Sequence, residues 1–227
     1  MRNEKFENDI IAVPETFDKL DIVELDGEKF LKGEVDIIDT SGKLWDTYQI
    51  EIKGSGKYPY SFPKLFETAG AFPKIVDWHV YEFDDKSCCV DITPNELILC
   101  KDGLNVSEYI QSFAIPYFAN QSFRIREGYY LYGEYSHGIF GRIEYYQSKL
   151  KAKNPKELIQ MFDLIIKDYN PDRTKYCPFC NKIKFRKCHK AVFKELSTIK
   201  EFLAWDGLEQ LIPFFKAYPD YKLPQGK

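Results

Sequence analysis

The sequence of 227 residues lacks a long apolar run and a large excess of charge of either sign. No window approaches the roughly 20 apolar residues that a membrane span needs. The first ten residues, MRNEKFENDI, hold no apolar run of the kind found in secretory signals. The formal net charge of -3 excludes a protein that binds nucleic acid through its overall charge. We therefore expect a cytoplasmic protein that does not associate with membranes.

Cysteine and histidine are also scarce, and their placement is uneven. The chain has six Cys and three His, and most of them fall in two tight groups. An even number of Cys would allow complete disulfide pairing, but a long chain without a signal sequence more often keeps its thiols reduced. Cys88 and Cys89 are adjacent, which disfavours a strain-free bond between them. We expect cysteines used for chemistry, metal binding or packing.

Hydrophobic periodicity predicts strands first and helices later, which is typical of the α+β class. Residues 33–39 and 44–53 flank an Asp-Thr-Ser-Gly turn and predict a β-hairpin, with short strands at 64–67 and 78–83. A short helix is expected at 4–11, before Pro14. Longer helices, with Asn105 or Ser107 capping the first and Asn154 capping the third, are predicted at 106–118, 140–150, 155–169, 191–205 and 208–218. A boundary near 151–154 would separate a domain of residues 1–150 from a helical extension, 151–227.

Three features follow one another in residues 58–92, YPYSFPKLFETAGAFPKIVDWHVYEFDDKSCCVDI. A turn with Tyr58-Pro59 and Pro63 comes first, His79 follows, and Cys89 lies ten residues after His79. In this order the segment resembles the ubiquitin-conjugating enzyme (UBC) family. That family has a Tyr-Pro-x-x-Pro-Pro turn, a strand, a His-Pro-Asn motif and a catalytic Cys ten residues after the His. The resemblance covers residues 33–118, and the UBC-like domain that it implies spans residues 1–150.

The segment departs from the family pattern at three positions. Phe62 replaces the first Pro of the pair, Val80 replaces the Pro of the motif, and Tyr81 aligns with its Asn, which supports the oxyanion in the family. In this respect the chain is similar to divergent bacterial members, which act with dedicated activating enzymes or in anti-phage operons. His137, between Ser136 and Gly138, lies in a stretch that also occurs in bacterial relatives.

The resemblance implies a UBC-like antiparallel β-meander flanked by helices, and an acyl transferase. Cys89 would carry, as a thioester, the C-terminal carboxyl of a ubiquitin-like protein or of an operon partner such as a cyclic-nucleotide synthase in anti-phage defence. It would then transfer that carboxyl to an amine of an acceptor protein. His79 would orient the loop, and His137 would have either a loop-stabilising or a catalytic role. Tyr81, Ser87 or His137 could replace the missing Asn donor. An external activating enzyme is implied, because no Gly-rich nucleotide loop follows a strand.

The residue types agree with this assignment. A thioester carrier needs an accessible thiol on a fixed loop, and Cys89 follows the polar turn 84–87. Its neighbour Cys88 should point to the opposite side of the chain and pack as a small buried hydrophobe. Cys100 has no motif partner and is expected to be structural.

The second group of Cys and His lies in YCPFCNKIKFRKCHK, residues 176–190. Cys177 and Cys180 form a Cys-x2-Cys pair, and after seven residues Cys188 and His189 complete four ligands. Such a set is typical of a closed structural zinc site, with a redox pair or plain thiols as alternatives. The segment resembles the SEC-C zinc motif, although it has one extra residue inside the first Cys pair and lacks the Gly-Ser-Gly of that motif.

The same stretch is basic, which leaves two other functions open. Residues 173–190 contain seven Lys or Arg and no acid, namely Arg173, Lys175, Lys182, Lys184, Arg186, Lys187 and Lys190. These charges could balance the thiolates of a solvated knuckle, or form a docking patch for a protein or nucleic acid. The alternatives to the enzyme are therefore a catalytically inactive UBC-like binding module and, less favoured, a zinc-stabilised nucleic-acid-binding protein.

Overall fold

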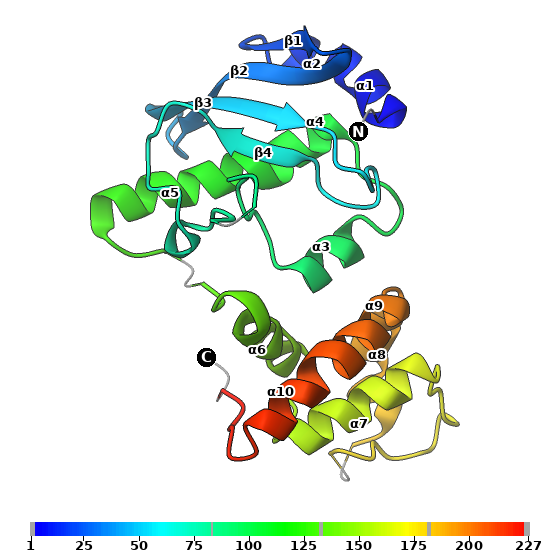
Figure 1. Ribbon diagram of the computed structural model, residues 1–227. Coiled ribbons are helices and arrows are strands. Elements are labelled where there is room, and N and C mark those ends of the chain that lie inside the picture. The colour runs from blue at the N-terminus through cyan, green and yellow to red at the C-terminus, as the bar shows by residue number, and fades with distance from the viewer. Residues whose placement is uncertain (1–2, 83, 132–133, 181–182, 225–227) are drawn as a thin grey trace. The chain divides into compact units, whose positions relative to one another are not determined.

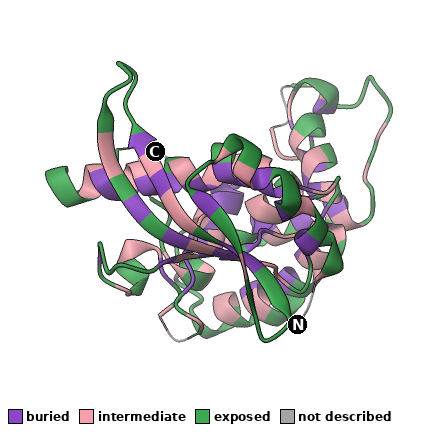
Figure 2. Ribbon diagram, turned by 90° about the horizontal axis from the view of Figure 1, so that it is seen from above, coloured by how far each residue is buried: buried purple, intermediate pink, exposed green. Residues whose placement is uncertain are grey.

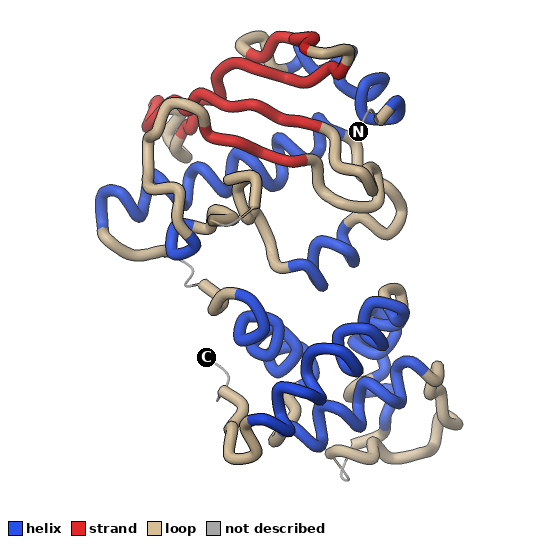
Figure 3. Tube along the Cα trace, viewed as in Figure 1, coloured by secondary structure: helices blue, strands red, loops and turns tan. Residues whose placement is uncertain are grey.

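The computed structural model describes residues 3–82, 84–131, 134–180 and 183–224 (Figure 1). The chain divides into a first unit, Met1–Asp91 with Asp102–Glu134, and a second unit, Ile92–Lys101 with Tyr135–Lys227. All strands of the described residues lie in the first unit, as Figure 3 shows, so the α+β class is confirmed. No helix in the described part of the chain has both the length and the apolar character needed to cross a membrane.

The first unit begins with short helices. Helix α1 (Glu4–Asp9) is followed by a 3-10 helix (Ile10–Ala12) and α2 (Val13–Thr16). The side chain of Asn3 caps α1 by accepting a hydrogen bond from the Phe6 N–H at 3.0 Å. The short helix expected at 4–11 is therefore confirmed, although its last residues adopt the tighter 3-10 form.

A four-stranded antiparallel sheet follows in the order β1-β2-β3-β4. Its strands are β1 (Leu20–Leu25), β2 (Glu28–Ile38), β3 (Leu44–Lys53) and β4 (Lys64–Glu67). The predicted hairpin is confirmed in β2 and β3, and the predicted strand at 64–67 is β4. Strand β1 was not predicted from the sequence. It joins β2 through Asp26 and Gly27, both at positive φ (54° and 77°), as a tight two-residue hairpin turn requires. Buried and exposed residues alternate along the strands (Figure 2).

The helix predicted at 106–118 packs against this sheet and is longer than expected. It comprises α4 (Val106–Tyr109), a π-helical turn (Ile110–Ala114) and α5 (Ile115–Glu127). Asn105 caps it, accepting from the Glu108 N–H at 2.8 Å. Figure 1 shows α5 crossing one face of the sheet, where the Phe118 ring stacks on Tyr48 with centroids 4.6 Å apart. This contact between α5 and β3 forms the centre of the first unit's core.

The prediction of a strand at residues 78–83 is wrong. A 3-10 helix (Val76–Trp78) ends at His79, which has left-handed backbone angles (φ 52°, ψ 50°). Only Val80 forms a β-bridge in the described part of this stretch, and its partner is Cys88. Phe83 lies outside the described residues.

The second unit is helical in the residues described. Its helices are α3 (Thr93–Leu99), α6 (Gly138–Leu150), α7 (Pro155–Ile166), α8 (Lys190–Ser197), α9 (Lys200–Trp205) and α10 (Ile212–Ala217). The helices expected at 140–150 and 155–169 are confirmed, and Asn154 caps α7 by accepting from the Glu157 N–H at 2.9 Å. The helix expected at 191–205 is broken between α8 and α9, and α3 was not predicted.

The division into units differs from the boundary expected near 151–154. Helix α6 belongs to the second unit because its buried residues, Ile143, Tyr146 and Leu150 among them, are part of that unit's hydrophobic core. The same core surrounds the fully buried Asp206, at the start of a π-helical turn (Asp206–Leu211). The Asp206 carboxylate accepts from Tyr146 Oη at 2.7 Å and pairs with Arg142 Nε at 3.0 Å.

Candidate functional site

The Tyr-Pro turn anchors the loops of the first unit to its core. Tyr58 is buried, and its hydroxyl donates to the Asp9 carboxylate at 2.6 Å. The carbonyl of Pro59, which follows a cis peptide bond, accepts from the Leu104 N–H at 3.0 Å. Phe62 packs against Tyr109 with ring centroids 5.1 Å apart. The turn therefore fixes the chain that leads into β4.

The loop after β4 folds back on itself and brings His79 and Cys89 together through their backbones. The Cys89 N–H donates to the His79 carbonyl at 2.7 Å, and the Tyr81 N–H donates to the Ser87 carbonyl at 2.9 Å. The Cys88 N–H donates to the carbonyl of Leu65 in β4, also at 2.7 Å. The cysteine pair is thus attached to the sheet on one side and to the His79 turn on the other.

The two adjacent thiols have different environments. Cys88 is 7% exposed, and burial raises the pKa of its thiol to about 11. Cys89 is only half-buried, and its thiol donates a long hydrogen bond (3.7 Å) to the Asp91 carbonyl. Because neighbouring side chains of an extended chain point to opposite sides, only one of the two can face the core. The expectation that Cys88 is buried is confirmed.

The His79 side chain points to a partner other than the thiol in the contacts described. Its Nε2 lies 2.8 Å from the Glu134 carboxylate, and its ring packs against Tyr130 with centroids 5.0 Å apart. The His79 carbonyl accepts from Tyr117 Oη of α5 at 3.0 Å, in addition to the Cys89 N–H. His79 therefore positions the cysteine loop through its backbone, while its imidazole is engaged with Glu134.

Helix α5 holds the same loop from a second direction. The carbonyl of Trp78 accepts from the Gln121 side chain at 3.1 Å, and the Arg124 guanidinium lies over the Trp78 ring at 4.3 Å. Arg124 also donates to the Asp77 carbonyl. Tyr117 lies in the helix predicted at 106–118, but its contact with the loop was not predicted. Nothing in the local sequence indicates that contact, because the two segments lie 38 residues apart.

The remaining residues singled out from the sequence differ in exposure. Tyr81 is 42% exposed, whereas Ser87 is 5% exposed, so Tyr81 is the more accessible of these two donors. His137 is half-buried and stands at the N-terminal boundary of α6 in the second unit. Cys100 is fully buried at the end of α3, as expected of a structural residue.

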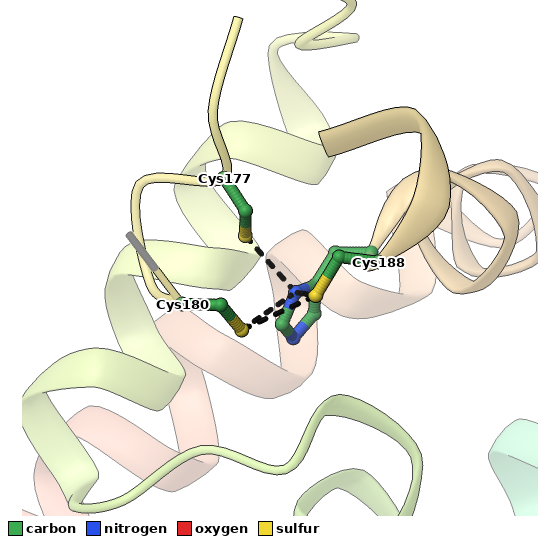
Figure 4. A group of neighbouring side chains, drawn as sticks. Cys177, Cys180 and Cys188 are labelled. Carbon is green, nitrogen blue, oxygen red and sulfur yellow. Dashed lines mark hydrogen bonds between the residues drawn. The ribbon is translucent and has the colours of Figure 1, made fainter. Parts of the chain in front are cut away.

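The second unit brings Cys177, Cys180, Cys188 and His189 together. Their ligand atoms all lie within 4.8 Å of one another. Figure 4 shows the three sulfur atoms pointing toward one another, those of Cys177 and Cys180 from one turn and that of Cys188 from a second segment. Nδ1 of His189 lies 3.2 Å from the Cys177 sulfur, 3.8 Å from that of Cys180 and 3.0 Å from that of Cys188, while the Cys180 and Cys188 sulfurs are 3.2 Å apart.

These distances are close to those required around one four-coordinate ion. Zinc bonds of about 2.3 Å to sulfur and about 2.0–2.1 Å to nitrogen place neighbouring ligand atoms of a tetrahedron roughly 3.5–3.8 Å apart. The observed separations of 3.0–3.8 Å are similar or slightly shorter. The four ligand atoms therefore lie close enough together to bind one metal ion.

The surroundings of the cluster also favour metal binding. Nε2 of His189 lies 2.8 Å from the Leu150 carbonyl, which can accept only if that nitrogen carries the proton. Nδ1 then presents its lone pair to the sulfurs, an arrangement in which an outer hydrogen bond fixes the metal-binding tautomer. The Cys177 N–H donates to the Ile183 carbonyl at 2.8 Å, and α8 begins directly after His189.

The charges near the cluster are those expected for thiol ligands. Burial and the neighbouring sulfurs raise the pKa of Cys188 to about 12, so a nearby cation is what would favour its thiolate. Six members of the basic stretch are in the described residues, namely Arg173, Lys175, Lys184, Arg186, Lys187 and Lys190, whereas Lys182 lies outside them.

No protein-family model, curated protein or solved structure matches the chain. What the two sites can do must therefore be argued from their own geometry. The first unit presents a half-exposed thiol on a loop held by the sheet and by α5. The second presents four ligand atoms that can hold a metal ion.

Proposed function

We propose that this chain is a UBC-like acyl carrier that accepts a protein C-terminal carboxyl on Cys89 and passes it to an amine. The observation that carries the proposal is the contrast between the adjacent thiols. Cys88 is buried and protonated, whereas Cys89 is half-exposed at the position where the sequence resemblance puts the nucleophile. The order of α1, a four-stranded meander, the cysteine loop and later helices also agrees with that resemblance.

The proposed reaction has two steps that balance in atoms and electrons. The Cys89 thiolate attacks the thioester carbonyl of a charged activating enzyme, and the enzyme's own thiolate leaves as the new thioester forms. An amine of the acceptor protein then attacks this thioester, forming an amide bond, and the Cys89 thiolate leaves. The amine's proton passes to solvent or to a base. The first step exchanges one thioester for another and needs little activation of the nucleophile.

The loop geometry supports a positioning role for His79 in this scheme. Its carbonyl fixes the Cys89 N–H and its imidazole is paired with Glu134. The side chain that aligns with the family's Asn is Tyr81, whose hydroxyl is a hydrogen-bond donor on an exposed residue. In other acyl-transfer enzymes such a donor contributes about 10²–10³ in rate. We assign Tyr81 this donor role in the second step.

The second unit contributes a structural zinc ion in this proposal, held by Cys177, Cys180, Cys188 and His189. The set of three thiols and one imidazole is one that zinc prefers in closed sites. Its position between α7 and α8 would join the helical elements of a unit that has no sheet in the described residues. The donor is a ubiquitin-like or operon-encoded protein, and an activating enzyme and an acceptor protein are the other partners.

The test is co-expression of the chain with its genomic neighbours, followed by electrophoresis under reducing and non-reducing conditions. The native chain should form an adduct that added thiols cleave, because a thiol exchanges with a thioester. Cys89→Ser should form an ester that resists thiols but is cleaved by base, or no adduct, and Cys89→Ala should form none. Cys88→Ser is the matched control and should retain the adduct that thiols cleave.

Equal loss of the adduct in both serine variants, or an adduct in Cys89→Ala, would contradict the assignment of Cys89. If the native chain forms no adduct with any neighbour but binds one of them stably, an inactive binding module with the same fold explains the chain better.

A further inference from the structure

A pocket of about 430 Å³ lies on the second unit between the C-terminal end of α7 and one face of α8. Its floor is apolar and is made by Ile165, Phe185 and Phe193, all of which are at most 4% exposed. The volume is in the range of sites that bind small ligands or a few side chains, about 300–1,000 Å³. The proposed Cys89 chemistry uses none of these residues.

One face of α8 supplies both the apolar and the charged part of the pocket. Lys190, Phe193, Lys194 and Ser197 all line it, and their spacing places them on the same side of the helix. Phe193 is buried, whereas both lysines are exposed. The lysines therefore form a charged rim beside an apolar floor.

This rim carries positive charge that the described parts of the chain do not neutralise. Among the described residues, neither Lys190 nor Lys194 makes an ion pair. Asp168 also lines the pocket, but its carboxylate is paired with Lys200 at 2.7 Å. The basic stretch of residues 173–190, which ends at Lys190, adds further cations directly before α8 in the sequence. A ligand of complementary charge is therefore an anion.

We infer that this pocket binds an acidic peptide segment that carries one aromatic or aliphatic anchor side chain. The anchor would occupy the space above Phe185 and Phe193, and neighbouring Asp or Glu carboxylates would pair with Lys190 and Lys194. A nucleic acid fits less well, because base stacking needs exposed ring faces. The rings of Phe185 and Phe193 are 2% and 4% exposed and pack edge-on against each other at 5.3 Å.

The inference is independent of the proposed acyl transfer and can be tested on the full-length chain. Labelled protein is applied to an array of synthetic peptides in which one Phe, Leu or Trp is flanked by Asp and Glu, by Lys, or by Ser. A parallel series lacks the apolar residue. We expect peptides with both features to bind at least tenfold more tightly than peptides with either alone, as measured by fluorescence anisotropy, and the affinity to fall with salt.

Two double charge-reversal variants distinguish binding in the pocket from attraction to the overall charge of the protein. Lys190→Glu with Lys194→Glu should weaken binding about tenfold or more, and the first of these changes suits a helix N-terminus. Lys156→Glu with Lys216→Glu changes the net charge equally at exposed positions that do not line the pocket, and should leave binding within about twofold.

Three results would overturn the inference. They are equal weakening in both double variants, no preference for acidic peptides with an apolar anchor, and tighter binding of an oligothymidylate than of any peptide in the array.

Discussion

Removal of the zinc ion that we propose for the Cys177, Cys180, Cys188 and His189 cluster should strongly lower the melting temperature of the second unit. Cys177 is fully buried and His189 is 6% exposed, so both ligands are attached to the core. A metal site that exists only in the folded state adds its binding free energy to the free energy of unfolding. The second unit should therefore depend on the ion for much of its stability.

The size of the effect follows from mass action. Free zinc at 100 times its dissociation constant stabilises the folded state by about 2.7 kcal/mol. For a unit of about 100 residues, each kcal/mol shifts the melting temperature by about 4–8 °C. Stripping the ion should therefore lower the melting temperature of the second unit by about 10–20 °C.

The assay combines elemental analysis with calorimetry of the native chain before and after treatment with a chelator. Because a chain with two units need not unfold in one step, limited proteolysis during heating identifies which unit opens first. Cys188→Ser removes a ligand and should lose the metal. Cys100→Ser removes a buried thiol of the same unit outside the cluster and should keep one equivalent.

Less than about half an equivalent of zinc in the purified chain would contradict a structural zinc site. An unchanged melting temperature after the zinc is stripped would contradict it as well.

Two further predictions concern stability. Burial raises the pKa of the Asp206 carboxyl, so its contribution to stability is full below about pH 4 and is lost as the pH rises through the raised value. Urea titrations give the free energy of unfolding of the native chain and of Asp206→Asn. The native value minus the variant value should therefore fall between pH 4 and 7. A difference that stays constant with pH would contradict this. In Gly33→Ala, the new Cβ would lie 2.0 Å from the Lys19 carbonyl oxygen at a φ of +150°. This substitution should lower the free energy of unfolding by about 1–3 kcal/mol. Gly56→Ala, where the new Cβ meets open space, should lower it by less than about 1 kcal/mol. Equal losses in both variants would show that the close contact is not the cause.

Structural elements that depend on residues close together in the sequence could be predicted from the sequence alone. The β2–β3 hairpin has alternating residues on both sides of a turn, and the Asn105 and Asn154 caps act within three residues. Strand β1 was missed because its burial hardly alternates, with only Leu20 fully buried. The signal available for it was the Asp26-Gly27 turn, a strong hairpin pair.

The failed strand at 78–83 shows where local patterns stop being informative. The stretch is rich in aromatic residues, which favour strands, but the Trp78 carbonyl accepts from side chains of α5, and the His79 carbonyl accepts from Tyr117 of α5 and from the Cys89 N–H. Those partners, Tyr117 and Gln121, lie about 40 residues away in the sequence. A single sequence does not indicate such a contact.

The same contacts explain why a motif could point to Cys89 although its individual residues differ from the family pattern. The ten-residue spacing from His79 corresponds to a hydrogen bond between the Cys89 N–H and the His79 carbonyl, closed by the turn between them. This bond requires the backbone of residue 79 and a left-handed turn there, and makes no demand on the side chains at 80 and 81. The ten-residue spacing between His79 and Cys89 is therefore evidence about where the loop holds the Cys89 thiol. In the proposed transfer, the rate would depend instead on the side chain that donates to the oxyanion, which is the role we propose for Tyr81.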